Sequence, residues 1–302
     1  MNWALVLSGG GARGLAHIGV LEALEELKVP RPSLIAGCSM GAIIGGLYAT
    51  GMSPFEMRKY LGTRFDVTDF MSDAAFTLPR GPLNKVFQIG QGVKNLFSAD
   101  GIDSGDKVRN LLLELTRGAE FGSTEIPFFC NSTDLCTGAE VVLTDGPIAE
   151  AMRASASFPG IFSPVPRDGM LLADGYLRNN TPVWIPRTRG IRHVFAVYLG
   201  RFTRIDRSRL KNAADVVLRS FDCAVYARKP RRRDIPTASI LVDNDRSPFD
   251  FDRPDLQINF GYEAAMAQGL VIDAFFAKGP RGMSARRSLA HHERKGATHE
   301  QP

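Results

Sequence analysis

Short apolar runs alternate with helical hydrophobic spacing over the first fifty residues. Residues 3–8 form an apolar run that ends in glycines, which predicts a short buried strand. Residues 15–27 then place apolar side chains at helical spacing, and two prolines end the predicted helix. A second apolar run over 33–37 and a helix of small residues over 40–50 follow. This alternation predicts a parallel sheet covered by helices.

The rest of the chain continues the pattern after one interruption. Between 54 and 104 the hydrophobic period is lost, which predicts a cap over a site or a mobile insertion. Within it, Val86–Phe97 reads as an interfacial lid or as an ordinary amphipathic surface segment. Further helices are predicted over 106–115, 148–156, 213–226 and 261–277, and strands over 127–131, 140–143, 170–173, 193–199 and 238–242. Beyond Gly279 the composition turns basic and polar, so we expect one domain over 1–279 and a disordered tail over 280–302.

Composition is that of a soluble globular protein, with 44% hydrophobic and 23% charged residues. The apolar run at the N-terminus is cut by glycines too early for a signal peptide, and no stretch approaches the ~18 apolar residues of a membrane-spanning helix. The four cysteines show no metal-binding spacing, which predicts reduced, mostly buried thiols and no structural metal. We therefore expect a cytoplasmic protein.

Part of the positive charge sits in two segments of a chain whose net charge is +5. They cover 228–233 and 281–295. Such runs are often only a solvated face, and their functional alternative is attraction to anionic lipid headgroups. Aromatic residues do not interleave with the run over 228–233 and no nucleic-acid-binding module is recognisable, so no nucleic acid is expected as a partner. Peripheral contact with an anionic membrane is the functional reading that remains.

Ser39 is the first candidate for chemistry. The segment Gly37-Cys38-Ser39-Met40-Gly41 matches the pattern GxSxG, with a short apolar strand before it and a helix after it. The glycines relieve crowding in a sharp turn that presents the serine at the head of the helix. There the helix N-terminus supplies positive potential and free N–H groups. This context favours a nucleophile elbow.

The glycine-rich segment Gly9-Gly10-Gly11-Ala12-Arg13-Gly14 follows the first strand and has two interpretations. A dinucleotide-binding loop requires an acidic residue at the end of the second strand, about twenty residues on. Here the second strand runs directly into Gly37, so the loop is better interpreted as a cradle of N–H groups for an oxyanion. Arg13 either holds this loop or faces an anionic headgroup.

A serine nucleophile needs a base, and two kinds of residue are available. Of the five histidines, His17 lies inside a predicted helix, His193 starts a strand, and three occupy the predicted tail. Only His193 competes as a base. Asp174, followed by Gly175, comes at the end of an apolar strand, where its carboxylate can accept the serine proton directly. The second arrangement is a two-residue dyad.

Taken in order, these motifs resemble those of the patatin-like phospholipase family. The resemblance rests on the glycine loop, the elbow at Ser39, the Ser155–Gly160 segment and Asp174-Gly175, and it covers about residues 4–185; Gly261–Ala265 is similar to the family's final helix. It implies a Ser39–Asp174 dyad, an oxyanion hole formed by Gly9, Gly10, Gly11, Ala12, Arg13 and Gly14, and a three-layer α/β/α fold with a mostly parallel sheet. It also implies that no metal or cofactor is needed.

The resemblance further implies a fatty acyl ester as substrate, such as a phospholipid or lysophospholipid. One position departs from the family, in which Gly or Ala usually follows the Asp-Gly pair, because this chain has Tyr176. A larger side chain beside the base narrows or shields the site, which puts substrate size in question. Two alternatives remain: a transacylase with the same dyad, and a non-catalytic regulatory protein, which the presence of both dyad residues disfavours.

Overall fold

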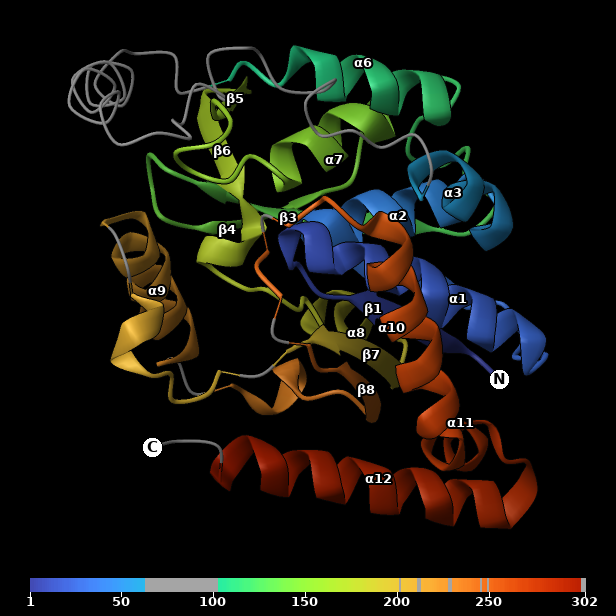
Figure 1. Cartoon of the computed structure of the whole chain (residues 1–302). Coiled ribbons are helices and arrows are strands. Elements are labelled where there is room, and N and C mark those ends of the chain that lie inside the picture. Colours follow the sequence, from blue (N-terminus) through green and yellow to red (C-terminus); the bar gives the residue numbers. More distant parts are fainter. Residues whose placement is uncertain are drawn as a thin grey trace.

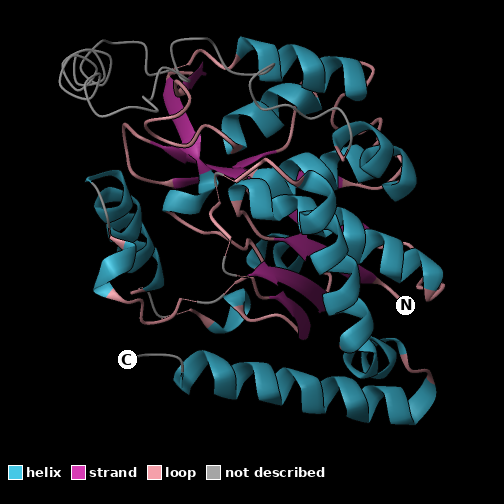
Figure 2. Ribbon diagram, viewed as in Figure 1, coloured by secondary structure: helices cyan, strands magenta, loops and turns pink. Residues whose placement is uncertain are grey.

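A sheet of eight strands forms the centre of the molecule (Figures 1 and 2). The computed structural model describes residues 1–62, 103–200, 202–210, 213–227, 230–244, 246–248 and 250–299. The strand order is β5-β6-β3-β2-β1-β7-β8, and β4 also pairs with β3. The strands are β1 Trp3–Leu7, β2 Leu34–Gly37, β3 Phe128–Asp134, β4 Glu140–Leu143, β5 Val165–Arg167, β6 Met170–Asp174, β7 His193–Leu199 and β8 Ala238–Val242. The run from β3 through β2, β1 and β7 to β8 is parallel, and β4, β5 and β6 add antiparallel pairs.

Helices cover both faces of this sheet (Figure 1). They are α1 Ala16–Glu26, α2 Met40–Ala49, α3 Pro54–Leu61, α6 Asp106–Leu115, α7 Ile148–Ser155, α8 Trp184–Thr188, α9 Ala213–Tyr226, α10 Pro254–Ala267, α11 Gly269–Phe276 and α12 Gly279–His299. Short 3₁₀ helices include η1 Gly11–Leu15, η3 Gly175–Leu177 and η5 Arg232–Asp234.

Alternation along β1 shows how the layers are divided. Leu5 and Leu7 point into the larger core, shared with α1, α2, α7 and α10, whereas Ala4 and Val6 point into a smaller core shared with α8. Successive strand residues face opposite sides of a sheet, and a strand buried on both faces is apolar throughout. The predicted three-layer α/β/α class with a mostly parallel sheet is therefore confirmed.

Three features of the element map differ from the sequence prediction. The helix predicted over 261–277 begins earlier, at Pro254, and divides near Gln268 into α10 and α11. In the weakly patterned stretch, α3 begins with a capping box in which Ser53 and Glu56 satisfy each other's backbone N–H groups. β5 and α8 were not predicted. Most of the predicted cap over 54–104, including Val86–Phe97, lies outside the described residues.

The predicted disorder of the tail is wrong for residues 280–299, which belong to α12. Hydrogen bonds attach this helix to the domain, and Leu289 packs against the larger core. Glu293 accepts a hydrogen bond from Ser239 Oγ at 2.6 Å, and Arg286 donates to the carbonyls of Phe275 and Ala277 at the end of α11. Arginine is well placed there, because the last carbonyls of a helix lack intrahelical partners. The helix is polar over most of its surface, so composition alone did not reveal it.

Candidate active site

The carboxyl ends of neighbouring strands bring the predicted site residues together. In the strand register Leu7 lies opposite Gly37, and Gly37 lies opposite Cys130. Two residues further along β3, Ser132 pairs with Asp174, the last residue of β6. The glycine loop and the turn at Ser39 therefore follow parallel strands at the same end of the sheet, the usual location of sites in α/β folds. β6 runs antiparallel to β3 and ends at Asp174 beside them.

Ser39 occupies the sharp turn that the GxSxG pattern predicts. Its φ is 52°, a positive value that a residue with a side chain rarely adopts, and α2 begins at the next residue. The flanking glycines are needed for close contact. A Cβ at Gly37 would lie 2.4 Å from the Gly41 carbonyl oxygen, and one at Gly41 would lie 2.4 Å from the Leu7 carbonyl oxygen. The strand, turn and helix of a nucleophile elbow are all present.

The Ser39 hydroxyl donates a hydrogen bond to Asp174 Oδ2 at 2.7 Å. The other carboxylate oxygen, Oδ1, accepts the Tyr176 N–H at 2.8 Å and lies 3.8 Å from the Cys38 thiol sulfur. Asp174 is also fixed through its backbone, because its N–H donates to the Ser157 carbonyl and its own carbonyl accepts from Thr133 Oγ1. Both carboxylate oxygens are thus oriented, and one of them faces the serine.

Burial controls the protonation of Asp174. The side chain is 1% exposed, and burial raises its pKa from 3.8 to about 7, against the lowering effect of hydrogen bonds from Tyr176, Ser39 and Cys38. A carboxylate out of water loses hydration that favours its charged form. Near neutral pH this group is close to half ionised, which suits a general base. The same burial raises the pKa of the Cys38 thiol well above its ordinary value, so Cys38 stays protonated.

In the glycine loop, two backbone amides are engaged and two are not. The Gly9 N–H donates to the Asn180 carbonyl at 3.1 Å, and the Ala12 N–H donates to the Pro248 carbonyl at 2.7 Å. The amides of Gly10 and Gly11, between them, donate to no acceptor among the described residues. Gly9 packs directly on the elbow, since a Cβ there would lie 3.1 Å from Ser39 Cβ. Of the six predicted loop residues, Gly10 and Gly11 are therefore the ones with N–H groups to offer a ligand.

Two further loop residues support this arrangement. A Cβ at Gly14 would lie 2.3 Å from Met40 Cγ, so the methionine after the nucleophile packs across the end of the loop. Arg13 is half-buried, and its positive charge lowers the pKa of the Tyr176 hydroxyl. The Arg13 Nε atom is buried without a hydrogen-bond partner among the described residues.

Tyr176 directs its side chain toward α9. Its hydroxyl donates a short hydrogen bond to Asp222 of α9, and its ring lies 6.1 Å from the ring of Phe158. Burial, followed by the Asp222 carboxylate, raises the pKa of the Tyr176 hydroxyl well above its usual range. The residue that departs from the family pattern thus links the Asp174 loop to α9.

Sequence reasoning missed two neighbours of the site. Ser155 Oγ is buried and accepts the Ser39 N–H at 3.0 Å. Asn180 accepts from Gly9 through its carbonyl, and its side-chain amide lies 3.3 Å from the Gly9 carbonyl oxygen. A signal existed for Ser155, which opens the Ser155–Gly160 segment that resembles the family. None existed for Asn180, which reaches the loop only through the tertiary fold.

Among the described residues, the Ser39 hydroxyl is hydrogen-bonded to Asp174 and to no histidine. His193 pairs with Trp3 at the start of β1, four residues or about 13 Å from Leu7, and its ring packs edge-on against Phe275. His17 is buried, its Nε2 donates to the Ser8 carbonyl at 2.8 Å, and burial lowers its pKa to about 4. The other three belong to α12. His17 therefore acts as a neutral structural group beneath the loop.

Metal-binding clusters, disulfides and membrane-spanning helices are absent from the part of the chain that the structure describes. Among the described residues no group of three or more His, Cys, Asp or Glu side chains is arranged to hold a metal ion. All four cysteines are free thiols, with Cys38 and Cys130 buried and Cys136 and Cys223 exposed, so the prediction of mostly buried thiols holds for two of them. In the same part of the chain, no helix combines the length and apolar character needed to cross a bilayer.

Comparison with known proteins assigns the family. A family model described as patatin-like phospholipase matches residues 5–187, which include both Ser39 and Asp174. The chain belongs to the patatin-like phospholipase family. It is 33% identical over 199 residues to mouse patatin-like phospholipase domain-containing protein 7, and 34% identical over 200 residues to lysophospholipase NTE1 of Candida glabrata. These matches cover 65% of this chain but only 13% and 10% of the two relatives.

A solved structure agrees at the level of the patatin-like fold. VipD from Legionella pneumophila superposes with a TM-score of 0.52 at 16% identity, over 97% of this chain and 74% of that chain. At this identity the likeness supports the fold alone. Family membership is consistent with lipid ester hydrolysis.

Proposed function

We propose that the protein is a serine acyl hydrolase that cleaves a fatty acyl ester, such as a phospholipid or lysophospholipid, through an acyl-enzyme. Ser39 is the nucleophile and Asp174 the base. The observation that carries the proposal is the 2.7 Å hydrogen bond from Ser39 Oγ to the buried Asp174 carboxylate, whose pKa is about 7. The names of relatives, among them a lysophospholipase, support the substrate class.

In the acylation step, Asp174 accepts the hydroxyl proton as Ser39 Oγ forms a bond to the ester carbonyl carbon. The carbonyl oxygen becomes an oxyanion and accepts hydrogen bonds from the Gly10 and Gly11 amides. When the C–O bond to the alcohol breaks, Asp174 returns the proton to the departing oxygen. An ester of Ser39 and a free alcohol result, so charge and protons balance.

In the deacylation step, water takes the place of the alcohol. Asp174 accepts a proton from the water as its oxygen attacks the acyl carbon, and the same amides stabilise the second oxyanion. Collapse of that intermediate breaks the bond to Ser39 Oγ, which takes the proton back from Asp174. The products are a free carboxylic acid and unmodified enzyme.

The proposal also includes peripheral contact with an anionic membrane, which two surface features support. The outward face of α9 carries exposed side chains without charge, while half-buried Phe221 and Asp222 face the domain. The exposed set on α9 is Val216, Val217, Ser220, Cys223, Ala224 and Tyr226, and exposed Ala227 follows the helix. Figure 1 shows α9 at the outer edge of the molecule. An uncharged helix face of this kind suits the boundary between headgroups and acyl chains.

Positive charge follows α9 directly. Arg231, Arg232 and Arg233 are exposed in and beside η5. Burial lowers the pKa of Arg187, and the charges of Arg294 on α12 and of Arg232 each lower it further. Each basic residue near an anionic bilayer contributes ~1 kcal/mol to binding.

The catalytic proposal is tested by covalent labelling and by two substitutions. A fluorophosphonate probe should label Ser39 in the folded protein, and Ser39→Ala should abolish the labelling. Ser39→Ala and Asp174→Asn should each lower kcat/KM for p-nitrophenyl esters by about 10³-fold or more, with the fold retained by circular dichroism. His193→Ala is the control and should keep full activity. Full activity of Asp174→Asn together with loss in His193→Ala would replace the dyad by a triad.

The assay also separates hydrolysis from acyl transfer. With an added alcohol acceptor, a hydrolase releases mainly free carboxylic acid, whereas a transacylase accumulates the new ester. Folded protein that neither labels nor turns over any ester would favour a regulatory protein without catalysis.

A further inference from the structure

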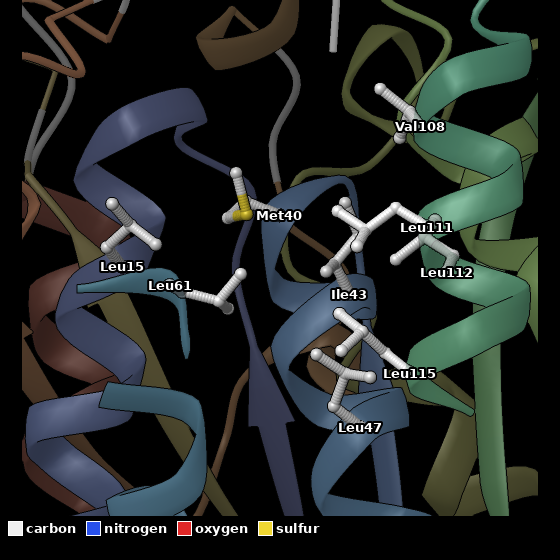
Figure 3. Close-up of a pocket in the computed structure, with 9 residues that line it drawn as sticks. All are labelled: Leu15, Met40, Ile43, Leu47, Leu61, Val108, Leu111, Leu112 and Leu115. Atoms are coloured by element: carbon white, nitrogen blue, oxygen red, sulfur yellow. The ribbon is translucent and has the colours of Figure 1, made fainter. Parts of the chain in front are cut away.

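A cavity of about 40 Å³ lies between α2 and the helices around it, and all nine residues that line it are apolar. They come from η1, α2, α3 and α6: Leu15, Met40, Ile43, Leu47, Leu61, Val108, Leu111, Leu112 and Leu115. Figure 3 shows Leu111, Leu112 and Leu115 of α6 pointing toward Ile43 and Leu47 of α2. We call this space the α2–α6 pocket.

The pocket begins where the proposed catalytic segments end. Leu15 follows Gly14, the last residue of the glycine loop, and Met40 follows Ser39. Met40 also packs across Gly14, so the two segments meet at one side of the pocket. Met40, Ile43 and Leu47 repeat at helical spacing along α2, which rises about 10 Å between the first and the last. The pocket therefore extends from the neighbours of the nucleophile toward the end of α2.

We propose that the α2–α6 pocket binds the acyl chain of the ester that Ser39 attacks, with Met40 as its entrance residue. The inference rests on the proposed function and names the substrate portion that this face of the site receives. A lining with no polar side chain favours an alkyl chain, because a headgroup placed there would lose its hydrogen bonds to water. Each buried methylene would instead contribute ~0.8 kcal/mol, a factor of about four in binding.

The walls differ in how easily they move. The start of α6 is held by Arg153, which donates to the Ser104 carbonyl at 2.6 Å and to the Gly105 carbonyl at 3.2 Å. Arg109 of α6 also pairs with Glu150 of α7 at 2.5 Å. Met40 is only half-buried, and an unbranched thioether adapts its rotamer readily. Since 40 Å³ is well below the roughly 150 Å³ of a cavity that admits benzene, an acyl chain enters only if the pocket widens. We assign this movement to Met40, the lining residue next to Ser39.

The competing explanation is an ordinary packing void, and substitutions at two lining positions separate the two. Ile43→Trp fills the pocket, and Leu111→Ala enlarges it. Leu24→Ala removes the same atoms from a buried site on α1 outside the pocket, and Leu270→Trp adds the same ring to an 85% exposed site on α11. Leu24→Ala controls for the loss of stability in Leu111→Ala, and Leu270→Trp controls for the added ring of Ile43→Trp. Neither control residue lines the pocket.

The readout is the ratio of kcat/KM values for p-nitrophenyl octanoate and acetate, each normalised to the sites that a fluorophosphonate titrates. In the unmodified protein kcat/KM should rise by up to about fourfold per methylene, as 0.8 kcal/mol per methylene implies. Ile43→Trp should lower the ratio at least tenfold, and Leu111→Ala should raise it. Leu24→Ala and Leu270→Trp should leave the ratio unchanged. Equal ratios in all variants would identify a packing void and overturn the inference.

A binding measurement separates failure of the pocket from failure of the proposed function. Calorimetry with sodium laurate and Ser39→Ala requires no turnover, and adding Ile43→Trp should raise Kd at least tenfold. Laurate binding that depends on Ile43 in a protein that hydrolyses no ester would retain the pocket and reject the hydrolase. Laurate binding that Ile43→Trp does not change would reject the pocket, whatever the hydrolytic activity.

Discussion

Ionisation of Asp174 is expected to raise activity and to lower stability as pH increases. Only its ionised form can accept the Ser39 proton, so kcat/KM should rise with pH through about 7, the pKa to which burial raises this group. Between pH 3.8 and about 7 the folded protein keeps a proton that the unfolded chain releases. The contribution of this group to stability therefore falls as pH rises through that window, by a few kcal/mol at most.

Asp174→Asn removes both effects and is measured by urea unfolding. The free energy of unfolding of the variant, relative to the unmodified protein, should be smallest near pH 4 and should increase toward pH 8. His17, whose pKa is lowered to about 4, titrates in both proteins and cancels from the difference. A difference that stays constant over this range would show that Asp174 ionises at its ordinary pKa in the folded protein.

The sequence paired two distant residues through the order of its motifs, which resembles that of the family, rather than through strand direction. Ser39 and Asp174 are separated by 135 positions, and each follows or ends an apolar run. Because β6 runs antiparallel to β3, strand ends alone do not predict that Asp174 lies beside Ser39. The division of labour inside the glycine loop was not predictable. Gly9 and Ala12 are engaged by Asn180 and Pro248, which come from elements elsewhere in the chain.

The crossing of α1 and α10 depends on glycine at two positions. A Cβ at Gly261 would lie 1.8 Å from the Ala16 carbonyl oxygen, and one at Gly19 would lie 1.9 Å from the Ile258 carbonyl oxygen. The helix backbones therefore touch, and α1 continues directly from η1 of the glycine loop. This contact gives a physical reason for the Gly261–Ala265 segment that resembles the family's final helix.

Gly261→Ala should force these helices apart and destabilise the protein by roughly 1–3 kcal/mol, the usual range for overpacking. Activity should fall as well, because α1 supports the glycine loop. Gly269→Ala is the matched control, since nothing lies within 4 Å of its Cβ position in α11. It should be neutral or stabilising by up to ~1 kcal/mol. Equal urea midpoints for the two variants would show that the helices separate without cost.

Element prediction succeeded where the hydrophobic period was strong and failed where other forces decide. α6 and β7 have the predicted bounds because both are apolar on the faces they bury. The helix α3 was missed although Ser53 and Glu56 form its capping box, because the residues around it show no clear hydrophobic period. α12 has no apolar stripe strong enough to detect, and its hydrogen bonds to Ser239 and to the end of α11 are tertiary.

At the scale of the whole molecule, two exposed basic segments bear on the proposed membrane contact. Arg231 to Arg233 and the basic helix α12 are exposed, and α9 connects this region to Asp174 through the bond between Tyr176 and Asp222. The sequence located both basic segments but described one of them as a disordered tail. As a helix, α12 instead holds Arg294 where its charge acts on Arg187, as the charge of Arg232 also does, whereas a flexible tail would spread this charge.

This distribution predicts binding to anionic vesicles that is sensitive to salt. Co-sedimentation with phosphatidylcholine vesicles containing phosphatidylserine should exceed that with phosphatidylcholine alone and weaken as sodium chloride rises from 0.05 to 0.5 M, about a threefold shorter Debye length. Replacing Arg231, Arg232 and Arg233 by serine should weaken binding at least tenfold, at ~1 kcal/mol per residue. Val216→Glu should also weaken binding, whereas Leu270→Glu on α11 should not. If both glutamate variants behave alike, α9 is not the face that meets the bilayer, and any binding is a property of net charge alone.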